Sequence, residues 1–153
     1  MQFRAATLQD IPRLEELEQA VVAAERPFNT QIRANNPKYY NLPELINSPD
    51  SYLLVVEVQD EIVATGYAKI RNSKSALSHA KDAYLGFMFV SPTFRGQGLN
   101  QKVIAELMAW AKNRSVHDFY LDVYADNQAA IRAYEKLGFA PSLVEMKLHT
   151  PPA

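Results

Sequence analysis

A glycine-rich loop is the first stretch of the sequence that could do chemistry. It reads VSPTFRGQGLN at residues 90–100 and places Gly96 and Gly98 beside Arg95, between a strongly apolar run and a predicted helix. Glycines let backbone N–H groups turn toward one point, and the N-terminus of a helix adds positive potential there. The loop is therefore predicted to bind an anion.

Two familiar phosphate-binding loops do not match this stretch. A Walker loop needs Gly-Lys-Ser/Thr, whereas Leu-Asn follows Gly98. A dinucleotide fingerprint needs a third glycine where the chain has Gln101, and a tighter turn after the strand. Acidic residues do lie about 20 positions further on, at Asp118 and Asp122, as that fingerprint asks. Nicotinamide-dinucleotide binding therefore stays open as an alternative.

A second motif lies in LDVYADNQAAIRAYEKLGFAP, residues 121–141. Its spacing is N-x-x-A-x-x-x-Y-x-x-x-G-F, and its members are Asn127, Ala130, Tyr134, Gly138 and Phe139. Taken with FMFVSPTFRGQGLNQKVIAELM, where Arg95, Gly98 and Asn100 follow a V-x-P strand end, the chain resembles the GNAT superfamily of N-acetyltransferases. The resemblance covers residues 84–141 closely.

The resemblance implies that the co-substrate is acetyl-CoA, with its pyrophosphate held by backbone amides of the loop. The residues that match this cradle are Arg95, Gly96, Gln97, Gly98, Leu99, Asn100 and Gln101. Asn100 stands where the family usually has glycine or alanine, and its side chain could crowd a phosphate. The strand positions whose N–H groups polarise the thioester carbonyl in the family match Met88, Phe89 and Val90. Their other interpretation, as core strand residues, is compatible with this one.

The resemblance also implies roles for two residues of the second motif. Tyr134 occupies the motif position of the family's general acid. A phenol with a pKa near 10 is protonated at neutral pH and can donate a proton to a leaving thiolate. Its helical spacing from Ala130 alone would indicate core packing. Asn127 matches a residue that contacts the pantetheine arm, although an asparagine at a helix start is also a typical N-cap.

Asp122 aligns with an acidic residue that acts as a general base in some family members, although a solvated strand-end aspartate is the simpler interpretation. Glu57, Tyr84 and Glu25 are the alternatives for the base. The chain has no cysteine, which excludes a cysteine-bound acyl intermediate, so direct attack in a ternary complex is expected.

The segment 27–50 is rich in proline and asparagine and is either a surface connection or an acceptor-binding loop. Arg33, Tyr39 and Tyr40 are its candidate acceptor-contacting residues, with a solvated loop position as the alternative for Arg33. The resemblance implies a primary amine of a small molecule or amino acid as the acceptor. A protein or peptide N-terminus, and a non-catalytic acyl-CoA-binding module, remain open as alternatives.

The elements that must position these residues are predicted from hydrophobic periodicity and breakers. The expected fold class is α/β, with helices packed on both faces of a central mixed sheet. Strands are predicted at 2–6, 52–59, 61–70, 83–90, 119–125 and 142–149, and helices after Thr7 to Pro27, at 42–47, from Gly98 to Ala111, and at 127–138.

The bulk composition limits the partners. With 153 residues the chain is predicted to be one domain, 1–153, and a net charge of −1 argues against nucleic acid as a partner. No signal core begins the chain, and AYLGFMFV is too short to cross a membrane, so a cytoplasmic protein is expected. His79, His117 and His149 have no metal-ligand spacing and are expected to be lone surface residues. A homodimer stays open.

Overall fold

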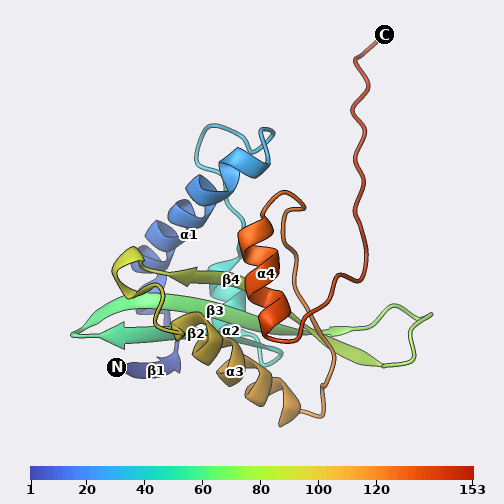
Figure 1. The fold of residues 1–153 in the computed structure, drawn as a ribbon. Helices are drawn as coiled ribbons and strands as arrows, with labels where there is room; N and C mark the ends of the chain where they lie inside the picture. The colour runs from blue at the N-terminus through green and yellow to red at the C-terminus, as the bar shows by residue number, and fades with distance from the viewer. The chain divides into compact units, whose positions relative to one another are not determined.

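A five-stranded sheet organises the fold in a computed structural model that describes residues 1–153 (Figure 1). Its spatial order follows the chain, β1-β2-β3-β4-β5, with antiparallel pairing up to β4 and a parallel β4–β5 pair. The strands are β1 Gln2–Ala5, β2 Ser51–Val58, β3 Glu61–Asn72, β4 Lys81–Val90 and β5 Phe119–Tyr120. The α/β class with a mixed sheet, predicted from periodicity, is confirmed.

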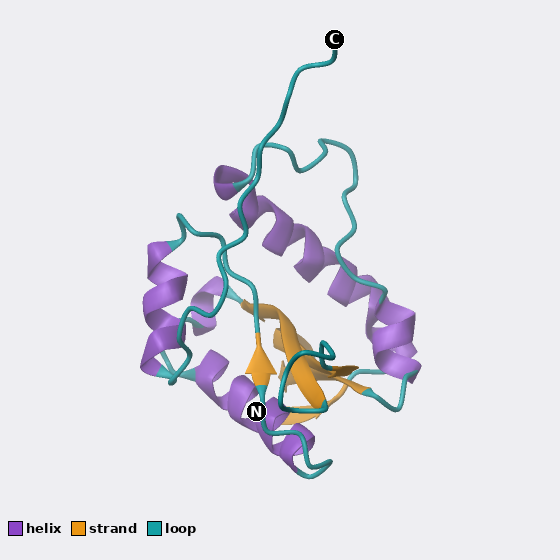
Figure 2. Cartoon of the chain, turned by 90° about the vertical axis from the view of Figure 1, so that its right-hand side faces the viewer, coloured by secondary structure: helices purple, strands orange, loops and turns teal.

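The helices cover both faces of this sheet, as Figure 2 shows for the strands and helices of residues 1–122. They are α1 Ile11–Glu25, α2 Leu42–Asn47 and α3 Leu99–Lys112. Leu53 and Val55 of β2 are buried with α1 and α2, whereas Gly66 of β3 faces Val103 and Leu107 of α3. Because β2 is covered on both sides, its run Leu53–Val56 is apolar throughout rather than alternating.

The chain divides into two compact units, residues 1–122 and 123–153, which are described separately. The second contains α4 Gln128–Lys136, which ends in a left-handed Gly138 with φ of 101°. The prediction of a single domain over 1–153 stays a prediction. No helix in the structure is both long and apolar enough to cross a membrane.

Two strand predictions near the C-terminus are wrong. The strand predicted at 119–125 is only Phe119–Tyr120, and residues 142–149 form no strand. Apolar residues alternate with polar ones at Val144, Met146 and Leu148, and this pattern predicts one buried face of a strand. All three side chains are exposed in the structure. A strand also needs an edge to pair with, and β5 pairs with β4 at two positions only. The local sequence pattern does not reveal whether a strand edge is available for pairing.

A partly buried ion network fixes the start of the chain against the sheet. Arg4 of β1 makes two hydrogen bonds to the carboxylate of Asp10, at 2.8 and 3.0 Å, and an ion pair with Glu57 of β2 at 3.3 Å. The backbone N–H of Thr7 also donates to Asp10, at 2.7 Å. The guanidinium of Arg4 is the main reason that the pKa of Asp10 lies below its usual value.

Replacing this carboxylate therefore gives a pH-dependent loss of stability. Asp10→Asn is expected to lower the free energy of unfolding by about 1–2 kcal/mol near neutral pH, because charge-assisted hydrogen bonds to Arg4 are lost. A lowered pKa contributes stability above the unfolded-state pKa and loses it as the pH falls through the folded-state value. Urea unfolding of both proteins at neutral pH and at about pH 3 measures this, and an undiminished difference at acidic pH would contradict it.

Candidate active site

The loop between β4 and α3 has the backbone geometry that its glycines predict. A short 3-10 helix, Pro92–Phe94, leads into Gly96 and Gly98, whose φ angles are +78° and +74°. Residues with a side chain rarely adopt this left-handed backbone conformation, so both positions favour glycine. Gly98 is also the N-cap of α3, and it directs the chain into the helix.

An uninterrupted run of backbone donors lines this loop. The N–H groups from Gly96 to Gln101 have no hydrogen-bond acceptor within the protein, and the regular helical bonds of α3 begin with Lys102 donating to Gly98 at 3.2 Å. These donors lie at the N-terminus of a 14-residue helix, where the macrodipole is positive. The arrangement suits a multiply charged anion such as a phosphate group.

Arg95 holds the loop against the end of β4. Its Nε donates to the carbonyl of Val90 at 2.9 Å, and its guanidinium lies 5.7 Å from the centre of the Phe89 ring. The Nε–H of Arg95 thus positions the loop, and the positive charge of Arg95 lies next in the chain to the unsatisfied N–H groups.

Asn100 lies within the first turn of α3 and does not have a left-handed backbone. Its side-chain oxygen, Oδ1, is buried and accepts no hydrogen bond. An oxygen in that position is turned into the protein rather than toward the solvent-facing side of the loop, which is where a phosphate would bind. The expected crowding of a phosphate by Asn100 therefore has no support in the side-chain position.

β4 contains a register shift just before the loop. Tyr67 of β3 pairs with Gly86 and Thr65 pairs with Phe89, so Phe87 and Met88 together lie opposite the single residue Gly66. Phe87 has a φ of +54°, which is unusual for a residue other than glycine. β5 pairs only with Ala83 and Tyr84 of β4, before the shift. The part of β4 after Tyr84 therefore has an edge without a strand.

Backbone groups of β4 point out from this open edge. The N–H of Ser91 donates to Val63 of β3 at 2.8 Å, and N–H directions alternate along a strand. The N–H of Val90 consequently points away from β3, whereas that of Phe89 points toward it. Met88 belongs to the register shift, where this alternation is interrupted. The role of all three strand positions in polarising a carbonyl stays a prediction.

Asp122 lies beside this opening, two residues beyond the last residue of β5. The hydroxyl of Tyr84 donates to its carboxylate at 3.0 Å. The pKa of Tyr84 lies well above its ordinary value. Burial of the phenol is the largest cause, and the charge of Asp122 is the next largest. Tyr84 is therefore a neutral donor that orients Asp122 rather than an alternative base.

Aromatic rings continue from Tyr84 across the α1 and α2 face of the sheet. The ring centres of Tyr84 and Tyr67 lie 6.3 Å apart, those of Tyr67 and Tyr40 lie 5.9 Å apart, and Tyr40 stacks on Phe87 at 4.4 Å. Tyr39 meets Tyr40 edge to face at 5.7 Å. We call Tyr39, Tyr40, Tyr67 and Tyr84 the tyrosine row.

Gly86 makes room for this row. A Cβ atom there would come within 2.5 Å of the Tyr67 ring. Burial raises the pKa of Tyr67 and of Tyr40, so their phenols stay protonated. Tyr67 and Phe87 were not predicted as site residues, because only the pairing of β3 with β4 brings them beside Tyr40.

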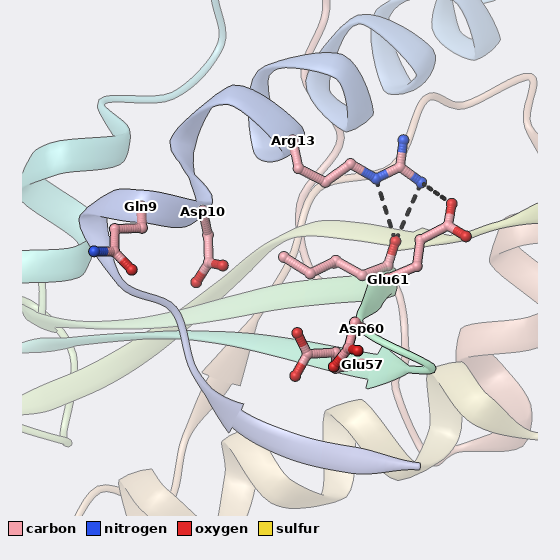
Figure 3. A pocket seen from close by; sticks show the side chains of 7 residues that line it. Gln9, Asp10, Arg13, Glu57, Asp60 and Glu61 are labelled. Carbon is pink, nitrogen blue, oxygen red and sulfur yellow. Dashed lines mark hydrogen bonds and ion pairs between the residues drawn. The ribbon is translucent and has the colours of Figure 1, made fainter.

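The two other carboxylates named as candidate general bases, Glu25 and Glu57, lie in different parts of the fold. Glu25 lies near Tyr39. Burial, the largest effect, raises the pKa of Glu25, whereas the hydroxyl of Tyr39 acts to lower it. Glu57 instead lies on the β1 side of the sheet, paired with Arg4, so it is not a candidate base. It lines a pocket of about 270 Å³ at the β2–β3 turn, where Arg13 donates to the Ile62 carbonyl and to Glu61 (Figure 3).

Glu18 is a site residue that sequence reasoning missed. It is 1% exposed on α1, and its Oε2 accepts hydrogen bonds from the backbone N–H groups of Tyr39 at 2.7 Å and Tyr40 at 2.9 Å. A signal was present, because Glu18 falls on the buried stripe of Leu14 and Val21 at helical spacing. A charged residue on such a stripe is rare unless it has a specific partner.

The remaining predicted residues have simpler surroundings. Asn127 is the N-cap of α4, and its side chain accepts from the N–H of Ala130 at 3.2 Å, which confirms the capping interpretation. Tyr134 lies on α4 with its ring 6.0 Å from that of Phe139. Both belong to residues 123–153, and their roles toward acetyl-CoA stay predictions. Arg33 is exposed and donates to the Asn36 carbonyl of its own loop at 3.4 Å.

His79 is not a lone surface residue. Its Nδ1 lies 2.6 Å from the Ser73 hydroxyl and its Nε2 lies 3.0 Å from that of Tyr120. The histidine thus links the β3–β4 connection to β5.

Comparison with protein families gives a match to the acetyltransferase (GNAT) family over residues 15–139. The chain is 28% identical to the uncharacterised N-acetyltransferase YjgM of Escherichia coli, over 90% of this chain and 80% of that protein. It is 27% identical to thialysine N-epsilon-acetyltransferase of Mus musculus, over 86% of this chain and 73% of that protein. The matches to YobR of Bacillus subtilis and mycothiol acetyltransferase of Paenarthrobacter aurescens cover only 25% and 28% of those proteins.

Solved structures share the fold. A point mutant of the BH1408 protein from Bacillus halodurans is 25% identical and has a TM-score of 0.88, over 99% of this chain and all of that one. A predicted acetyltransferase from Clostridium acetobutylicum, solved with acetyl-CoA, is 19% identical and has a TM-score of 0.76, over 97% of this chain and 95% of that one.

Removing the unsatisfied amide of Asn100 is expected to stabilise the protein. Asn100→Ala eliminates a buried oxygen without a donor and places a better helix former in α3, so the free energy of unfolding should rise by about 1 kcal/mol. Because the N–H run is backbone, affinity for CoA should not fall. Chemical denaturation and CoA titration of both proteins measure the two effects, and a weaker affinity for CoA would show that Asn100 contacts the ligand.

Proposed function

The chain belongs to the GNAT family of acetyltransferases, and from this membership and the site geometry we propose that it is an acetyl-CoA-dependent N-acetyltransferase acting on a primary amine of a small molecule or amino acid. The observation that carries the proposal is the run of unsatisfied N–H groups from Gly96 to Gln101, directly after the open edge of β4. The name of the mouse relative, a thialysine acetyltransferase, supports a small amine as acceptor.

The residues fit acetyl-CoA on chemical grounds. Its pyrophosphate is an anion that the N–H groups of the loop and the charge of Arg95 would hold. The pantetheine arm carries amide groups, and the open edge of β4 offers backbone partners to an extended amide chain. Acetyl-CoA supplies an acetyl group activated as a thioester.

The backbone of β4 would stabilise the reacting carbonyl. The N–H of Val90 points from the open edge, and a fixed donor of this kind is most effective where negative charge develops on oxygen. It is available because β5 pairs with β4 only at Ala83 and Tyr84.

Asp122 is the proposed general base, held by the hydroxyl of Tyr84. It takes a proton from the acceptor ammonium, either directly or through water, and the neutral amine then attacks. With no cysteine to carry an acyl group, attack is direct in a ternary complex. Tyr134 is proposed from its motif position to donate a proton to the departing sulfur.

Acetyl-CoA and CoA are expected to raise the thermal midpoint, whereas NAD is not. A ligand at about 100 times its dissociation constant adds about 2.7 kcal/mol of stability, which corresponds to a shift of several degrees for a chain of this size. A thermal-shift titration of the three ligands in parallel measures this. A shift with NAD alone would replace the proposal by the dinucleotide alternative.

Asp122→Asn is expected to lower kcat/KM by about 100-fold or more, because the amine loses its proton acceptor. Affinity for acetyl-CoA should be unchanged, which separates a catalytic from a binding defect. Asp60→Asn is the matched control, since Asp60 lies in the β2–β3 turn with a φ of +64° that asparagine tolerates. Steady-state kinetics over a range of pH measures this, and a retained activity would assign the base elsewhere.

A further inference from the structure

Carboxylates lie at both ends of the tyrosine row, and they differ in the partners that they have. At one end Asp122 receives the hydroxyl of Tyr84. At the other, Glu18 and Glu25 of α1 lie beside Tyr39 and Tyr40, and neither glutamate forms an ion pair in the structure. Two negative charges without a cation are unusual in a half-buried place, because charges removed from water are normally paired.

Glu18 shows this most clearly. Its Oε2 is fully used by two backbone N–H groups, whereas its Oε1 is buried and accepts no hydrogen bond. The residue lines a surface cavity of about 450 Å³ together with Tyr39, Tyr40, Glu15 and Lys38. A buried carboxylate oxygen without a donor, in a residue that lines a cavity, fits a ligand that brings N–H donors and positive charge.

The cations nearby make their contacts with other groups. Lys38 makes its ion pair with Glu15, at 2.8 Å, and its charge also acts on Glu18 without an ion pair between them. Arg26, which follows α1, donates to the backbone carbonyls of Ile32 and Arg33, both at 3.1 Å. Neither Glu18 nor Glu25 therefore has an ion-pair partner at this end of the row.

The opposite end of the row lies next to the reacting groups and has a cation beside it. Arg71 lies 5.0 Å from the Tyr84 ring centre, but its Nε donates to the buried carboxylate of Asp82 at 2.7 Å. Tyr40 connects the two ends, since its backbone N–H binds Glu18 while its ring stacks on Phe87 of the β4 register shift. Tyrosine faces along this path can stabilise an alkylammonium through cation–π contacts.

We propose that the acceptor is an amine carrying a second positive charge, which binds at Glu18 and Glu25 while the reacting amine lies at Asp122. This inference rests on the proposed N-acetyltransferase function and specifies its substrate class. The distal ammonium keeps its proton and takes no part in the chemistry. At the other end, the reacting ammonium loses its proton to Asp122, its nitrogen forms a bond to the acetyl carbon, and the carbon–sulfur bond breaks.

The test compares two acceptors of equal length, 1,5-diaminopentane and 1-aminopentane, with the full-length protein and acetyl-CoA. The wild-type protein is expected to have a kcat/KM at least about tenfold higher for the diamine, mainly through KM, because one added charge contact contributes on this scale. Glu25→Gln and Glu18→Gln should each remove most of that preference by raising KM for the diamine. In both variants KM for the diamine should rise more than KM for the monoamine.

Glu16→Gln is the matched control on the same helix. Glu16 is exposed and pairs with Arg13 at 3.0 Å, so its loss should leave both acceptors unaffected. A drop in the diamine preference of this variant equal to that of Glu25→Gln would overturn the assignment, since it would show a diffuse effect of the charge on α1.

Direct binding distinguishes this inference from the function on which it rests. Calorimetric titration of each amine into the protein, with CoA present, should show tighter binding of the diamine that Glu25→Gln abolishes. Tighter diamine binding without acetyl transfer would support the second-charge site and contradict the proposed activity. Turnover of both amines with equal KM and equal affinity would overturn the second-charge site and leave the proposed activity standing.

Discussion

The register shift in β4 is the constraint on which the candidate site depends. Two residues, Phe87 and Met88, lie opposite Gly66, and Phe87 adopts a positive φ. β5 pairs with β4 only before the shift, at Ala83 and Tyr84. The end of β4 therefore has an open edge next to the glycine loop, so backbone groups of the open edge and of the loop lie along one continuous stretch of chain.

The same shift determines what lies beside that edge. It turns Phe87 toward α1 and α2, where the ring is 3% exposed and stacks on Tyr40. Gly86, immediately before it, leaves space for the Tyr67 ring. The irregularity thus supports the aromatic surface over which an acceptor amine would lie, next to the open edge proposed for acetyl-CoA.

Stability and function use charge differently in this protein. Asp10 and Arg4 pair at 2.8 Å and hold β1 and the start of α1 to the sheet. Glu18 and Glu25 have no such pair, and the raised pKa of Glu25 shows that burial disfavours its charge. Buried carboxylates without an ion pair oppose folding. Glu18 partly offsets this cost by accepting from the backbone N–H groups of Tyr39 and Tyr40, and the proposed cationic ligand would offset the rest.

The sequence by itself determined the features that depend on local order. Helical spacing predicted α1 and α3, the β-branched runs predicted the β2–β3 hairpin, and the glycines at 96 and 98 predicted a donor-lined turn, because each follows from contacts within a few residues. Only the tertiary structure decided the short β5, the absence of a strand at 142–149, and the assembly of Glu18, Tyr40, Tyr67 and Tyr84. These depend on which strand edges are available and on the register of β3 against β4, and such pairings join residues far apart in the chain.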